Sequence, residues 1–198
     1  VRQLKTMFVA GGFSELKEKD SWSVEPGKKY YFTRNGSTIV AFAVGKKYKP
    51  GNGFAIIGAH TDSPCLKIKP RSKISSDGYL QVGSECYGGG TWMTWFDRDL
   101  TVAGRVMVKN GDKFEHKLCN LKKPILRIPN CAIHLNRDVN TKFEFNKDDQ
   151  LKPILCAAVD GGEDSHPSHH AKLLGLMAAE MNVKVEDIQD FEMCLADT

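Results

Sequence analysis

A histidine and an acid, two positions apart, follow an unbroken apolar run of six residues. Residues 54–59 (FAIIGA) are apolar, and Pro50-Gly51-Asn52-Gly53 precedes them, so we predict a buried strand there. His60 and Asp62 come next, and side chains two apart on an extended chain share a face. Ligands of open α/β sheets bind at the carboxyl ends of strands, where an imidazole can hold a metal and a carboxylate can orient the ligands. The alternative is a strand that simply ends in polar turn residues.

A second group of histidines and acids lies in residues 160–170 (DGGEDSHPSHH). Their spacing matches no standard zinc pattern, and the stretch is poor in apolar residues. We therefore predict a flexible, solvated loop and set a metal site here aside as the alternative. The group consists of Asp160, Glu163, Asp164, His166, His169 and His170.

Two further places carry polar residues that chemistry could use. Asp97-Arg98-Asp99 follows an aromatic run, and it is interpreted either as an arginine bridged by two acids in a packed structure or as part of a partner surface. His134 lies in an apolar segment, where the plain interpretation is a hydrogen-bonded core histidine. No nucleophile-elbow, P-loop or dinucleotide motif occurs in the sequence.

The first third of the chain predicts a helix followed by a small sheet. A helix early in residues 1–20 is closed by Gly11-Gly12. Strands at 30–34 and 37–44 are joined at Asn35-Gly36, which is a strong hairpin turn signal. Residues 54–59 are expected to form the third strand of this sheet.

After residue 64 the spacing of turns predicts a β-rich unit with one clear helix. The expected elements are a hairpin of 100–108 with 114–118, an edge segment interrupted by Pro129 at 124–135, a loop at 140–153, a helix at 171–181 ended by Asn182, and a strand at 191–195. The helix places Leu173, Leu174, Met177, Ala178 and Met181 on one apolar stripe.

Composition excludes several classes of protein. The 198 residues are 41% hydrophobic and 26% charged, and the net charge of +4 comes from scattered lysines and arginines, so we expect neither nucleic acid nor a membrane as partner. Six cysteines are widely spaced without a CxxC pair, which favours free thiols over disulfides or a thiolate zinc site. We therefore expect a cytoplasmic protein.

Four long motifs, in order along the chain, resemble the M18 family of dinuclear zinc aminopeptidases, the aspartyl aminopeptidases. They are GFAIIGAHTDSPCLKIKP, YGGGTWMTWFDRDLTVAGRV, PILRIPNCAIHLNR and the closing CLADT. The resemblance implies an α/β fold. Residues 1–69 are then the N-terminal part of a sheet-and-helix metallopeptidase domain, and residues 70–198 are an inserted β-rich dimerisation domain whose last residues return to the peptidase domain.

The resemblance also implies a function and a site. The whole protein is expected to release N-terminal Asp or Glu from peptides as a homo-oligomer, a dodecamer built from dimers, with two zinc ions per subunit. His60 corresponds to a zinc ligand, Asp62 to the carboxylate that orients that site, and His134 to a histidine lent to the substrate pocket of a neighbouring subunit. The other ligands and the general base are expected outside this chain, and the 160–170 loop looks shorter than its family equivalent. The rival is a non-catalytic assembly module or an inactive fragment.

Overall fold

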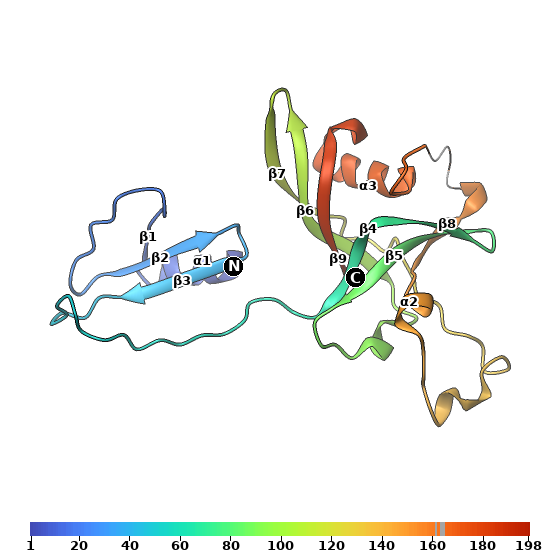
Figure 1. Ribbon diagram of the computed structural model, residues 1–198, viewed down its shortest axis with the longest axis horizontal. Coiled ribbons are helices and arrows are strands. Elements are labelled where there is room, and N and C mark those ends of the chain that lie inside the picture. Colours follow the sequence, from blue (N-terminus) through green and yellow to red (C-terminus); the bar gives the residue numbers. More distant parts are fainter. Residues whose placement is uncertain (161, 163–164) are drawn as a thin grey trace. The chain divides into compact units, whose positions relative to one another are not determined.

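A β-hairpin organises the first of two units into which the chain divides, Val1–Ser63 and Pro64–Thr198. The computed structural model describes residues 1–160, 162 and 165–198 (Figure 1). The hairpin turns at Asn35 and Gly36, whose φ angles of 51° and 66° suit the predicted turn. The unit comprises α1 (Arg2–Ala10) and a sheet of order β1-β2-β3, with β1 at Ser14–Glu15, β2 at Lys29–Arg34 and β3 at Thr38–Ala43.

The helix of this unit is held to the sheet by aromatic rings. The ring of Phe8 on α1 lies 4.9 Å from Phe13 and 6.0 Å from Tyr31, centroid to centroid. Tyr31 is buried on β2. Gly11 and Gly12 close the helix as predicted, since their N–H groups bond back to the carbonyls of its last turn.

The strand predicted at residues 54–59 is absent. This segment is irregular, and Phe54 and Ile57 are 79% and 99% exposed. The physical reason is that an apolar run becomes a strand only beside another strand. The described strands of this unit pair with one another, and none borders the segment. Thr61 Oγ1 donates a hydrogen bond of 3.1 Å to the carbonyl of Ser37.

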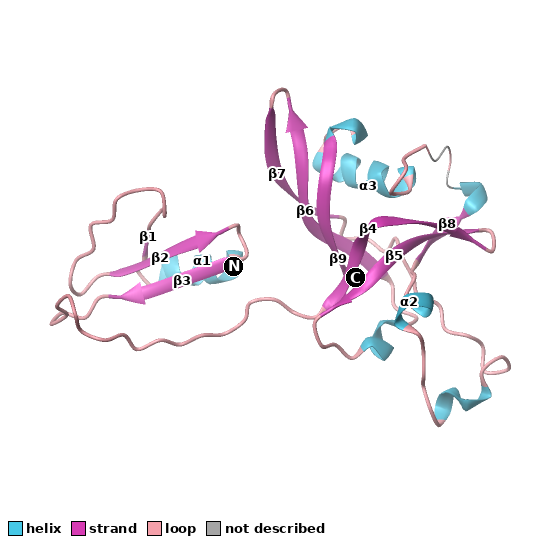
Figure 2. Cartoon of the chain, viewed as in Figure 1, coloured by secondary structure: helices cyan, strands magenta, loops and turns pink. Residues whose placement is uncertain are grey.

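The second unit is built on a six-stranded antiparallel sheet with the order β7-β6-β9-β4-β5-β8 (Figure 2). The hairpin predicted from 100–108 and 114–118 is confirmed as β6 with β7, and the C-terminal strand is confirmed as β9. The strands are β4 (Cys65–Ser76), β5 (Tyr79–Tyr87), β6 (Leu100–Asn110), β7 (Lys113–Asn120), β8 (Ile154–Ala157) and β9 (Ile188–Asp197).

Short helices and one long helix complete this unit. The long helix α3 (Ala171–Met181) has the predicted bounds, and Asn182 ends it in the left-handed conformation at φ 52°. The helix α2 (Lys147–Gln150) lies in a region predicted as loop, where Asn146 caps it through its side chain. Short 3₁₀ turns are η1 (Trp92–Trp95), η2 (Arg137–Asn140), η3 (Ala158–Asp160) and η4 (Val185–Asp187).

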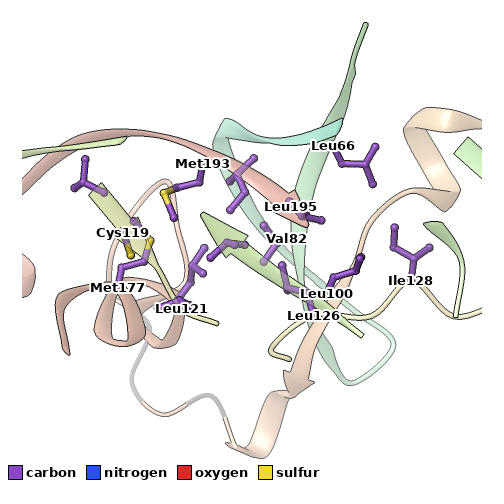
Figure 3. Packing of buried hydrophobic residues seen from close by; sticks show 14 of the residues in the cluster. Leu66, Val82, Leu100, Cys119, Leu121, Leu126, Ile128, Met177, Met193 and Leu195 are labelled. Atoms are coloured by element: carbon purple, nitrogen blue, oxygen red, sulfur yellow. The ribbon is translucent and has the colours of Figure 1, made fainter. Parts of the chain in front are cut away.

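Part of the core lies between α3 and the sheet, around Met177 and Cys119, and the cluster continues away from the helix to Leu66 and Ile128 (Figure 3). The predicted stripe of α3 is confirmed, because all five of its apolar residues are buried. Alternate residues of β6 face this core, which fixes the register of the sheet. The buried side chains labelled in Figure 3 are Leu66, Val82, Leu100, Cys119, Leu121, Leu126, Ile128, Met177, Met193 and Leu195.

The chain enters and leaves this sheet on neighbouring strands. Lys67 of β4 pairs with Cys194 of β9 in antiparallel register. The first residue of β4 and the last residues of β9 therefore lie at the same end of the sheet. Residue 70, expected as the domain boundary, falls inside β4, and the structure divides the chain between Ser63 and Pro64.

Gly104 on β6 is expected to tolerate no side chain. A Cβ there would lie 2.0 Å from the carbonyl oxygen of Glu192 on β9, so Gly104→Ala must push two core strands apart. We expect the free energy of unfolding to fall by about 3 kcal/mol or more in urea denaturation. Gly175→Ala on α3 is the matched control, since nothing lies within 4 Å of its Cβ, and it should stabilise by about 0.5–1 kcal/mol. Equal midpoints for the two variants would contradict this packing.

Candidate metal centre

His60 and Asp62 lie together on the extended segment that leaves the first unit. His60 Nδ1 lies 2.8 Å from the carbonyl oxygen of Asp62 and 3.5 Å from its Oδ1. A carbonyl oxygen only accepts hydrogen bonds, so Nδ1 carries the proton and the Nε2 lone pair is available. The histidine side chain is 83% exposed, so this nitrogen is open to a ligand. His60 and Asp62 are therefore adjacent, as predicted, although the segment before them does not form the predicted strand.

This arrangement fits one ligand of a zinc ion. Zinc-binding histidines commonly donate their other ring N–H to a carbonyl or a carboxylate, which fixes the tautomer. A catalytic zinc takes about three protein ligands, however. Among the residues that the structure describes, no group of three His, Cys, Asp or Glu side chains gathers to hold a metal. His60 therefore has the ring orientation suited to a single metal ligand, with the Asp62 side chain beside it.

His134 lies in an exposed turn of the second unit, at residues 133–135. The plain interpretation from its apolar surroundings, a hydrogen-bonded core histidine, is therefore wrong. Its neighbours Ile133 and Leu135 are exposed as well, so the apolar pattern of this segment does not bury it. An exposed, apolar, histidine-bearing turn is available for contact with another surface.

The packed interpretation, in which Asp97 and Asp99 bridge Arg98, is wrong. Arg98 donates to the carboxylate of Asp197 at the end of β9. The arginine that the two acids share is Arg127, with Nη1 3.1 Å from Asp99 Oδ1 and Nη2 3.9 Å from Asp97 Oδ1. Asp97 adopts a left-handed φ of 58° and accepts a hydrogen bond from the backbone of Asn130. These exposed pairs tie chain segments together and form no metal site.

The solvated-loop prediction is wrong for the histidines, since His166 and His169 are partly buried and His170 is fully buried, whereas Asp160, Gly162, Ser165 and Pro167 are exposed. Residues 161, 163 and 164, including Glu163 and Asp164, lie outside the described residues. His170 is fully buried, with Nε2 2.9 Å and 3.1 Å from the carbonyl oxygens of Ile74 and Gln81. The Ser168 carbonyl accepts from the N–H groups of Ser72 and Lys73. The register of β4 with β5 shifts between Ile68 and Lys73, and the Ser168 segment bonds to β4 at this irregularity.

His169 makes this contact sensitive to acid. Burial, followed by the charge of the nearby His166, lowers the pKa of His169 to about 4, although Asp190 opposes the shift. Below pH ~6.5 the unfolded chain therefore binds a proton that the folded chain excludes, and stability falls as the pH drops toward 4. We expect a loss of order 1 kcal/mol after solvent screening. Urea denaturation of His169→Gln should lack this part of the wild-type pH dependence, and equal pH profiles would contradict it.

All six cysteines are free, as predicted. Cys119 is buried beneath α3, and desolvation raises the pKa of its thiol to about 11, which leaves it unreactive. No helix among the described residues is long and apolar enough to cross a membrane.

The chain is thus a mixed α/β protein with an exposed His60 beside Asp62. The family model of the aminopeptidase I zinc metalloproteases (M18) matches residues 1–198, and the chain belongs to this family. Aspartyl aminopeptidase of Dictyostelium discoideum is 49% identical over 223 aligned residues, which cover 100% of this chain and 46% of the relative. The chain thus spans about half the length of the curated relatives it matches.

Solved structures agree with this assignment of fold. A chain of the Ape4 and Nbr1 complex, determined by cryo-EM, superimposes with a TM-score of 0.89 at 43% identity over 99% of this chain and 40% of that chain. The mApe1 dodecamer of Saccharomyces cerevisiae gives a TM-score of 0.74 at 28% identity over 99% of this chain and 43% of that chain. The predicted α/β class and its partial coverage of the family fold are confirmed.

Proposed function

We propose that the whole protein is a cytoplasmic, zinc-dependent aminopeptidase that releases N-terminal Asp or Glu from peptides as a homo-oligomer. The observation that carries this proposal is the similarity of the entire chain, at 49% identity, to a relative named aspartyl aminopeptidase. The family is described as zinc metalloproteases, and one neighbour is described as a dodecamer. Six free thiols suit a reducing compartment.

In this proposal His60 would bind one zinc through Nε2 while its Nδ1–H donates a hydrogen bond to the Asp62 carbonyl. The carboxylate of Asp62, 3.5 Å from the ring, favours the ligand tautomer and restricts ring rotation. Bound zinc, with two ions per subunit, would polarise the scissile carbonyl and lower the pKa of the attacking water. The remaining ligands and the general base come from outside this chain.

His134 would act in the neighbouring subunit. Its turn is exposed, and the flanking Ile133 and Leu135 present apolar surface suited to contact with another protein. There the imidazole would donate a hydrogen bond to the oxygen on which negative charge develops as the carbonyl is attacked. The role needs an assembled oligomer.

The second unit would be an insert that dimerises. Its entry at β4 and its exit at β9 lie on paired strands at one end of the sheet, which is the arrangement that lets a domain interrupt another without disturbing it. The exposed apolar residues 54–59 would then find strand partners in the part of the peptidase domain outside this chain. Such a run is otherwise a large exposed apolar patch.

The test is hydrolysis by the whole protein, purified with zinc, of matched peptides that differ only in the N-terminal residue. We expect kcat/KM for Asp and Glu to exceed that for Leu and Lys by ~100-fold or more, because a charged substrate group needs a paired partner in the pocket. A chelator should abolish the activity. Equal rates for all four peptides would refute the acidic specificity, and chelator-resistant hydrolysis would refute the metal.

A non-catalytic assembly module is the rival. The absence of a three-ligand metal cluster in the described part of the chain favours it for this polypeptide alone. Metal content after gel filtration discriminates between the two, because the enzyme should hold about two zinc ions per subunit and a module close to none.

A further inference from the structure

β7 is an edge strand that leaves apolar side chains in water. Its strand neighbour in the described sheet is β6, and its other side is open (Figure 1). Phe114 is 62% exposed and Leu118 is 80% exposed. Both lie on the face opposite α3, since the alternate residue Cys119 is buried on the α3 side. An open edge with exposed apolar residues is a template for pairing with another strand.

The sequence of β7 is complementary to itself around His116. In an antiparallel pair of two β7 strands centred on this residue, His116 faces its own copy. Phe114 then faces the partner's Leu118, which pairs two apolar side chains. Glu115 faces the partner's Lys117, which pairs opposite charges, and the two-fold axis repeats both pairs.

Neighbouring registers lack this complementarity. Because a two-fold axis normal to the sheet keeps each face on its own side, the allowed centres next to His116 are Glu115 and Lys117. A centre at Glu115 sets this acid against itself and Lys113 against the partner's Lys117. A centre at Lys117 sets that lysine against itself. Like charges directly opposite each other destabilise a strand pair.

We propose that two copies of this chain pair through β7 in antiparallel register centred on His116, so that their six-stranded sheets join into one. The inference rests on the self-association in the proposed function and assigns its surface. The joined edge covers Phe114 and Leu118 and supplies the open backbone groups of each strand with partners.

Charge reversal tests the register in the whole protein. Glu115→Lys and Lys117→Glu each set like charges opposite one another twice, so each should raise the dimer dissociation constant ~10-fold or more in sedimentation velocity. The double variant restores opposite charges with exchanged positions and should return to within about 3-fold of wild type. Unchanged dissociation in the single variants, or a double variant as weak as either single, overturns the proposal.

Cysteine cross-linking gives a second readout that does not depend on affinity. His116→Cys places two thiols on directly opposite residues, about 4.5–5.5 Å apart at Cα, which a disulfide can span. Phe114→Cys on the same face is the control, because its copy lies four residues away, about 13 Å along the strand. Oxidation should link the first variant and leave the second at the wild-type level, and equal linkage overturns the register.

The same preparations separate this proposal from the proposed function. If none of the β7 substitutions changes the dimer dissociation constant and the protein hydrolyses acidic peptides, the β7 interface is refuted and the proposed function stands. If the dimer depends on β7 but the wild-type protein holds no zinc and hydrolyses no peptide, the peptidase function is refuted and the β7 interface stands.

Discussion

Replacing His60 with alanine is expected to reduce kcat/KM for an N-terminal Asp peptide by ~1000-fold or more, the several kcal/mol that a catalytic metal contributes to the barrier. The reason lies in the ring geometry, since Nδ1 is committed to Asp62 and Nε2 is left open to a metal. The side chain is exposed, so its removal leaves no cavity, and folding and assembly should be unchanged. Steady-state kinetics on the zinc-loaded whole protein measures the effect.

Asp62→Asn is the graded companion to this variant. It keeps the backbone carbonyl that holds Nδ1 and removes the charge 3.5 Å from the ring, so we expect a loss of about 10–100-fold in activity or zinc affinity. Turnover of His60→Ala at the wild-type rate would refute the ligand assignment. A loss in Asp62→Asn equal to that in His60→Ala would show that the acid binds the metal itself.

Replacing His134 with phenylalanine is expected to lower kcat by ~100-fold or more while zinc content and oligomer size stay the same. The exposed turn carries the ring away from its own core, so the substitution should not alter the stability of the fold. A group that acts only on the developing negative charge affects kcat more than KM. Kinetics and zinc analysis of the same preparation separate this outcome from metal loss.

Mixed oligomers test whether His134 acts across the interface. In a dimer of one His134→Phe subunit and one His60→Ala subunit, the first retains its metal ligand and receives His134 from the second. A 1:1 mixture reassembled from inactive parents should then recover about a quarter of wild-type activity, because half of the dimers are mixed and each has one complete site. No recovery, with mixed dimers demonstrated by mass, would contradict a role in the neighbouring subunit.

Local signals predicted the elements that depend on few distant contacts. The apolar stripe and the Asn182 cap gave α3 with its bounds, and Asn35-Gly36 gave the hairpin of β2 and β3. The strand at residues 54–59 was wrong, because a strand also needs a neighbour and the described chain offers none. β4 was missed because its bulge and its Pro70 break the alternation of apolar residues.

The sequence also predicted some features of the candidate site and missed others. The two-residue spacing predicted that His60 and Asp62 lie together, and they do. The burial of His169 and His170 could not be predicted, because it depends on contacts far away in the sequence. His169 lies beside the hydroxyl of Ser72, and His170 lies beside the carbonyls of Ile74 and Gln81. The role of His134 rests on the family resemblance and stays a prediction.

The most direct test of the account is the zinc content of the purified, assembled whole protein and of its His60→Ala variant, measured by mass spectrometry of the metal after gel filtration. We expect about two zinc ions per subunit in the wild type and about one in the variant, at the same oligomer mass. Equal zinc in both proteins, or none in an active wild type, would contradict the claim that this imidazole binds the catalytic metal.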